Sequence, residues 1–67
     1  MEQLFSPQEV AARTGLTVQT LWKLRSHGEG PASFLLRGKV RYRESAVEAW
    51  IAEQEAAEQT RLTRLTG

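Results

Sequence analysis

Two short helical patterns, separated by a glycine and followed by a basic strand–turn–strand pattern, leave this chain few ways to fold. The first helix is expected to begin at residues 6–9, Ser-Pro-Gln-Glu. There a hydroxyl cap is followed by a proline at the first helical position and a glutamate that can close a capping box. Gly15 ends this helix, since glycine adopts the left-handed conformation at little cost. The second helix begins after Thr17 and ends at Gly28. The spacing predicts two helices joined by a tight turn.

A strand–turn–strand pattern follows the Gly- and Pro-containing loop at residues 28–31. Apolar residues recur at every second position on both sides of residues 37–39, as Phe34 and Leu36 before them and Val40 and Tyr42 after them. A period of two is the periodicity of a half-buried strand, and a glycine at its centre suits a reversal. The pattern predicts a β-hairpin with one face on the core, while its other face and its tip are basic.

A third helix is predicted from apolar residues at i, i+3 and i+4, namely Val47, Trp50 and Ile51. It is expected to start at Glu44 or Ser45, with Ser45 and Glu48 offering another capping box. After Gln54 the apolar face fades, although the next residues still favour helix. We therefore expect residues 53–67 to form a helical extension with a frayed tail.

Large apolar residues occur in every predicted element, so one shared core is expected within residues 5–52. The whole chain, residues 1–67, is then a single domain. The fold class that this order predicts is mainly α with a small β-hairpin: a helix-turn-helix, a two-stranded wing and a C-terminal helix. This is the plan of a winged helix-turn-helix.

The composition argues against catalysis and against a metal or cofactor site. There is no cysteine, which excludes disulfides, thiolate metal sites and a cysteine nucleophile. The one histidine, His27, lies beside a helix-ending glycine, where a helix cap is favoured over a catalytic role, and it cannot supply an ordinary zinc site alone. No apolar run approaches membrane-spanning length, and no signal-peptide pattern opens the chain. We expect a cytoplasmic protein that is not an enzyme and has no membrane contact.

Charge is distributed unevenly along the chain. Residues 1–43 carry seven basic and three acidic groups, whereas residues 44–67 carry two basic and five acidic groups. A DNA-facing half and a solvent- or protein-facing half would have this distribution. Chance unevenness in a small protein is the alternative.

The second helix is the candidate reader of double-stranded DNA, because in a helix-turn-helix this element enters the major groove. Leu21 and Leu24 are expected to face the core. The residues assigned to the major groove are Thr17, Val18, Gln19, Thr20 and Lys23, and those assigned to phosphates are Arg25, Ser26 and Arg43. Gln19 suits an adenine edge, and Lys23 suits guanine or phosphate. The alternative is an ordinary polar helix face.

Two residues of this helix are ambiguous. Trp22 either packs against the hairpin, which we favour, or lies along the DNA backbone. Arg25 either contacts phosphate or pairs with Glu29.

The tip of the hairpin is the second candidate DNA contact, made by Arg37, Gly38, Lys39 and Arg41. A narrow minor groove is electronegative and attracts inserted arginine. The alternative is that these cations only protect a sheet edge from aggregation.

These residues resemble the excisionase-like and AlpA-like group of small winged helix-turn-helix proteins, relatives of the MerR DNA-binding domain. The resemblance covers residues 5–52. It rests on the stretch SPQEVAARTGLTVQTLWKLRSHGEGP, the hairpin FLLRGKVRYR and the helical segment ESAVEAWI. The short tail resembles actinobacterial and actinophage examples.

The resemblance implies a DNA-bending accessory factor for site-specific recombination in a bacterial host cell, associated with the nucleoid. Such proteins bind direct repeats near an attachment site, cooperatively and side by side, and help an integrase to excise. Many relatives carry arginine where this chain has Val18 and Gln19. Its base readout is therefore expected to be less guanine-directed.

Three other functions stay open on the sequence. A small transcriptional regulator has the same fold, and fold does not determine function. A phage DNA-packaging subunit is disfavoured by the short chain. A protein-interaction module would use the acidic last helix, including Glu53 and Glu58.

Overall fold

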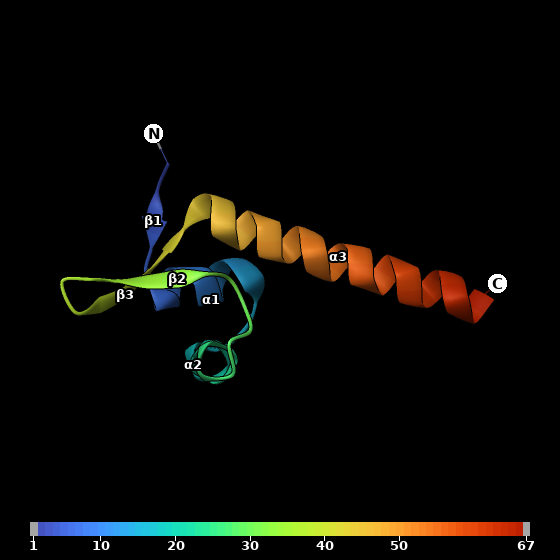
Figure 1. The fold of residues 1–67 in the computed structure, drawn as a ribbon, viewed down its shortest axis with the longest axis horizontal. Coiled ribbons are helices and arrows are strands. Elements are labelled where there is room, and N and C mark those ends of the chain that lie inside the picture. The colour runs from blue at the N-terminus through green and yellow to red at the C-terminus, as the bar shows by residue number, and fades with distance from the viewer. Residues whose placement is uncertain (1, 67) are drawn as a thin grey trace.

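The structure, a computed structural model, describes residues 2–66, with side chains described through residue 64. Its elements run in the order β1 (Leu4–Phe5), α1 (Pro7–Thr14), α2 (Val18–Ser26), β2 (Ser33–Leu36), β3 (Lys39–Arg43) and α3 (Glu44–Thr66). The predicted fold class is confirmed, since a helix-turn-helix, a β-wing and a last helix are all present (Figure 1). The predicted domain span includes residues 1 and 67, which lie outside the described residues.

Local hydrogen bonds define α1 as the sequence predicts. The Glu9 backbone N–H donates to Ser6 Oγ at 3.2 Å, and the Ser6 N–H donates to Glu9 Oε1 at 3.0 Å, which completes the capping box. The hydrogen bond from the Ser6 backbone lowers the pKa of the Glu9 carboxyl. At the other end Gly15 has φ 76° and its N–H donates to the Ala11 carbonyl at 2.9 Å. The chain then turns through Leu16 into α2.

The sheet has three strands rather than the predicted two. β3 lies in the centre and pairs antiparallel with β2 on one side and with β1 on the other. In β1, Leu4 pairs with Arg43 and Phe5 with Tyr42. A strand of two residues is too short to show a period-two pattern, so the sequence offered no sign of it.

The register of the hairpin differs from the prediction. Leu36 pairs with Lys39 and Leu35 with Val40 around a turn of only two residues. The prediction that Phe34 and Leu36 share the core face with Val40 and Tyr42 was wrong, because it assumed a loop of three residues. Paired residues project to the same face and neighbours to opposite faces, so a change of one residue in the loop moves a whole strand's side chains to the other face.

Each face of the sheet therefore has its own set of residues. The inner face carries Phe5, Ser33, Leu35, Val40 and Tyr42. The outer face carries Leu4, Phe34, Leu36, Lys39, Arg41 and Arg43.

Five elements each contribute one residue to the core: Phe5 from β1, Val10 from α1, Leu21 from α2, Tyr42 from β3 and Val47 from α3. All five are at most 3% exposed. Phe5 lies just before the cap of α1 and is buried in one cluster with Val10, which is the arrangement of a hydrophobic staple. The small core is thus shared by the whole helix-turn-helix, the wing and the start of α3.

The N-terminus of α3 is held by Glu2, a residue that is far from it in the sequence. The Ser45 N–H donates to Glu2 Oε1 at 2.7 Å, the Ser45 hydroxyl donates to the same oxygen, and Arg43 Nη1 donates to Glu2 Oε2 at 3.3 Å. The predicted capping box of Ser45 and Glu48 was wrong. Since β3 runs directly into α3 at Glu44 without a loop, the acceptor for these N–H groups comes from the segment before β1.

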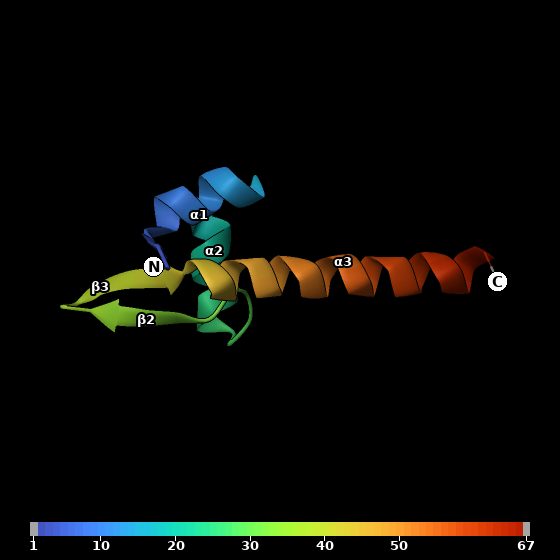
Figure 2. The ribbon, with the colours of Figure 1, turned by 90° about the horizontal axis from the view of Figure 1, so that it is seen from above.

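Only the first turns of α3 pack on the domain. Val47 is buried and Trp50 and Ile51 are half-buried, whereas residues 52–64 are all exposed. With 23 residues the helix is about 35 Å long, and it projects from the domain as a free arm in both ribbon views (Figures 1 and 2). The predicted helical extension is present, and fraying of its end stays a prediction.

We expect Glu2→Gln to weaken the domain in a pH-dependent way. The hydrogen bonds from Ser45, its side chain first, hold the pKa of the Glu2 carboxyl below its ordinary value of 4.5. A depressed carboxyl pKa stabilises the fold above 4.5, and the stabilisation is lost as the pH falls through the lower folded-state value. Glu2→Gln should therefore lower Tm at neutral pH and make little difference in strong acid.

Thermal unfolding followed by circular dichroism at both pH values measures this effect. The matched control is Glu53→Gln, which alters an exposed carboxylate on the projecting part of α3. Equal losses of Tm for both variants at neutral pH would show that Glu2 does not hold the start of α3.

Candidate nucleic-acid interface

The helix α2 has one face turned to the core and one face turned to solvent. Leu21 is 1% exposed and Leu24 half-buried, so these two face inward as predicted. Gln19 and Lys23, four residues apart on the helix, are both exposed, and Val18 is half-buried. In Figure 1 α2 is seen end-on below the sheet, with α3 leaving from the upper side. α2 therefore lies on the side of the sheet away from the α3 arm.

The start of α2 retains hydrogen-bond donors for an anion. Thr17 Oγ1 accepts from the Thr20 N–H at 3.1 Å, and the two hydroxyls are 2.9 Å apart. Two hydroxyls that share one hydrogen bond leave one O–H free to donate, whichever of them is the donor. The first-turn N–H groups of Val18 and Gln19 also have no carbonyl partner in their own helix. These donors together suit a phosphate.

Residues near the end of α2 have partners within the protein. Arg25 Nε donates to Ser33 Oγ at 3.0 Å, so Arg25 bridges α2 to the base of the wing rather than pairing with Glu29. Its terminal nitrogens remain available to a phosphate. The Ser26 hydroxyl donates to the Lys23 carbonyl at 2.9 Å. A phosphate contact from Ser26 would require this hydrogen bond to break.

The indole of Trp22 is incompletely packed. Trp22 is 42% exposed and lies outside the core cluster, so its packing against the hairpin stays a prediction. His27 occupies the C-cap position of α2, where its N–H donates to the Lys23 and Leu24 carbonyls at 3.2 Å each. This is the capping position that the sequence favoured for His27.

The tip of the wing carries an unusual backbone conformation. Arg37 has φ 53° and Gly38 has φ 80°, the signs that a type I′ turn requires at its two central positions. Arginine in the left-handed region costs roughly 1–2 kcal/mol, and asparagine is the usual residue there. A cation that is retained at such a cost is a candidate for binding. Figure 2 shows this tip projecting away from α1 and α2, on the side opposite the α3 arm.

The remaining wing cations do not lie beside α2. Lys39, Arg41 and Arg43 belong to the outer face, whereas α2 is joined to the inner face through Arg25 and Ser33. Arg41 is half-buried, and its Nη1 donates to the Val40 carbonyl at 2.7 Å.

Arg43 has two partners of its own. It pairs with Glu2 at 3.3 Å and lies 5.6 Å from the centre of the Phe34 ring. The structure therefore places Arg37, Gly38 and Lys39 together at the tip of the wing, which projects away from α2 (Figure 2), and places Arg43 apart from them at the end of β3.

Sequence reasoning missed two residues of this surface, Ser33 and Leu35. Both lie on the inner face of the wing, on the side where α2 lies. Their positions depend on the two-residue turn, and the only sign of that turn in the sequence was Gly38.

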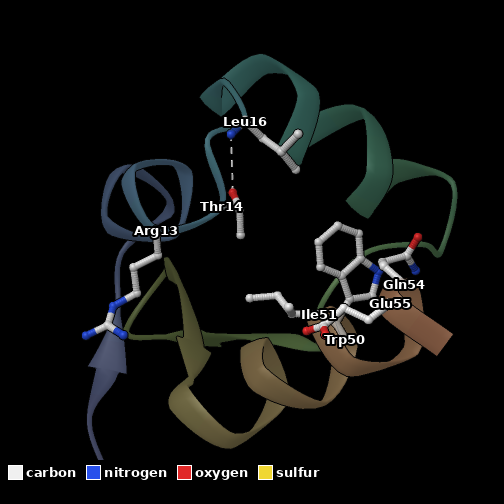
Figure 3. Close-up of a pocket in the computed structure, with 7 residues that line it drawn as sticks. All are labelled: Arg13, Thr14, Leu16, Trp50, Ile51, Gln54 and Glu55. Carbon is white, nitrogen blue, oxygen red and sulfur yellow. Dashed lines mark hydrogen bonds between the residues drawn. The ribbon is translucent and has the colours of Figure 1, made fainter. Parts of the chain in front are cut away.

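An apolar groove lies between the α1–α2 turn and α3 (Figure 3). Leu16, Trp50 and Ile51 point into it, and the dashed line marks the 3.3 Å hydrogen bond from the Leu16 N–H to Thr14 Oγ1. Its volume is about 290 Å³. None of the predicted DNA-contacting residues lines this groove, so it is separate from the candidate interface.

Within residues 2–66, no three His, Asp or Glu side chains are grouped as ligands of a metal ion. Over the same described part of the chain, no helix has both the length and the apolar character needed to cross a membrane.

Comparison with known proteins agrees with this geometry. A helix-turn-helix domain family matches residues 4–55, which include β1, α1, α2, the wing and the packed part of α3. No curated protein and no solved structure matches the chain significantly. Since the family match covers most of the sequence, the chain belongs to the helix-turn-helix domain family and is a small DNA-binding protein.

Proposed function

We propose that this protein is an excisionase, which binds direct repeats beside an attachment site and bends the DNA so that an integrase excises the element. In this role it catalyses no reaction of its own and acts on DNA in the cytoplasm of a bacterial host. The observation that carries the proposal is the joint presentation of α2 and the Arg37–Lys39 wing tip by one domain. A protein that contacts a major groove and a neighbouring minor groove together can hold DNA in a bent form.

The α3 arm supports the part of the proposal that concerns partners. Residues 52–64 are exposed and carry the acidic groups Glu53, Glu55 and Glu58. Arg61 pairs with Glu58 along the helix, with its Nε donating to Glu58 Oε2 at 3.1 Å. An exposed helix that points away from α2 and carries no excess of positive charge has little attraction for phosphates, so it is available to an integrase or to a neighbouring copy.

Footprinting of the purified protein across fragmented DNA of its source genome tests the proposal. We expect protection of adjacent direct repeats beside an attachment site, with retarded gel mobility from bending. Protection confined to promoter palindromes would instead identify a transcriptional regulator. No protection at low salt would contradict DNA binding and favour the protein-interaction role of α3.

We expect Gln19→Ala to relax sequence preference at one base pair. Gln19 is exposed at the start of α2, and its amide can pair with adenine in the major groove. The cost on the preferred site should be roughly 1–3 kcal/mol, with little change on non-specific DNA. Binding titrations over a set of single-base variants measure it, and Gln59→Ala on the exposed arm is the control. If every base preference survives, Gln19 is not a reader.

We expect Arg37→Asn to stabilise the domain and weaken DNA binding. Asparagine tolerates the left-handed conformation at φ 53°, so the free energy of unfolding should rise by about 1 kcal/mol and Tm by roughly 4–8 °C. Loss of one phosphate contact should reduce the salt slope of binding by about 1.

Arg37→Lys separates the two effects, because it keeps the charge without relieving the backbone. It should bind DNA nearly as the unchanged protein does and show no gain in Tm. Unaltered affinity and salt slope for Arg37→Asn would remove the tip of the wing from the interface.

A further inference from the structure

Leu35 is the most exposed large hydrophobic residue of the described chain, at 61%. It lies on β2, two residues before the turn, and pairs with Val40. Val40 is half-buried against the core, whereas Leu35 on the edge strand extends past it. Leu35 is thus an exposed apolar side chain at the same wing tip as the cations Arg37 and Lys39.

The register determines which way Leu35 faces. Ser33 lies two residues earlier on the same strand, so both side chains project to the inner face. Ser33 Oγ accepts the hydrogen bond from Arg25 of α2, which identifies this as the face toward α2. Leu35 is therefore on the side of the wing that α2 occupies, near the tip, where the core no longer covers it. Leu36 projects to the opposite face and is 46% exposed.

Proteins that bend DNA from the minor groove often insert an apolar side chain between two base pairs. Leucine is one of the residues used, and the partial unstacking kinks the duplex. Nearby cations favour such insertion, because they attach the wing to the phosphates that border the groove. Arg37 is placed for this in the two-residue turn, two positions after Leu35, and Lys39 adds a second cation at the same tip, on the outer face.

We propose that Leu35 is an apolar wedge, which enters the minor groove beneath the wing and partly unstacks a base step. The inference rests on the proposed function and adds to it a source of the bend. Binding then has two parts. The contacts of α2 and of the wing cations provide affinity for DNA, and the insertion of Leu35 bends the duplex. Flexible pyrimidine–purine steps should be preferred under the wing, because they unstack at the lowest cost.

The test compares Leu35→Ser with Leu36→Ser, two equal changes at adjacent exposed positions on opposite faces of one strand. The DNA is the footprinted duplex with 2-aminopurine placed at successive positions under the wing, and with a fluorophore pair at its ends. Energy transfer reports the bend, and 2-aminopurine fluorescence reports unstacking. Circular dichroism and Tm establish that both variants are folded.

We expect the unchanged protein to raise 2-aminopurine fluorescence at one step and to shorten the end-to-end distance. Leu35→Ser should still form the complex but lose both signals, whereas Leu36→Ser should retain both. Leu35→Phe, which keeps an apolar wedge, should retain them as well.

A folded Leu35→Ser variant that bends and unstacks the duplex like the unchanged protein would overturn the wedge while leaving the proposed function intact. Equal losses in Leu35→Ser and Leu36→Ser would also overturn it, since the effect would not depend on the face. Failure of the unchanged protein to bind any duplex at low salt would overturn the proposed function and the wedge together.

Discussion

The burial of Tyr42 at the centre of β3 is the constraint on which the rest of the molecule depends. Tyr42 is 1% exposed and is paired with Phe5 on one side and with Ser33 on the other. Its ring lies in one cluster with residues of α1, α2 and α3. Burial raises the pKa of the phenol, so the group stays neutral within the core. In a chain this small, one large buried side chain at the centre of the sheet supplies a sizeable share of the apolar burial.

The same register links the core to the DNA-facing surface. Because Ser33 lies opposite Tyr42, its hydroxyl faces α2 and accepts from Arg25 Nε at 3.0 Å, so a hydrogen bond ties the wing to α2. The relative placement of the two elements is thus set by the folded protein before it meets a ligand. A preorganised surface lowers the entropy cost of binding. A rigid surface also keeps a bound duplex from straightening, and a protein that bends DNA needs this rigidity.

Two features of the wing depart from ordinary local preferences. Arg37 occupies a left-handed position, and Leu35 leaves most of its surface in water. Proteins usually violate local preferences at functional sites, where another interaction offsets the cost. The two residues are neighbours at the tip, so one ligand can account for both. The outer-face cations differ, since Arg41 and Arg43 are partly engaged within the protein.

Much of the helical part was predictable because its determinants are local. The capping box at Ser6, the left-handed Gly15 and the Thr17 cap all act over three or four residues, within the reach of a sequence pattern. The sequence by itself therefore determined the helix-turn-helix, the location of the hairpin and the residues offered on α2. Only the tertiary structure decided which face of the sheet each wing residue occupies. It also decided that β1 adds a third strand and that Glu2 accepts hydrogen bonds at the start of α3. These depend on contacts between distant segments, and a single residue in a turn reverses the face of a strand. That reversal puts Leu35 on the face of the sheet toward α2 and Leu36 on the opposite face.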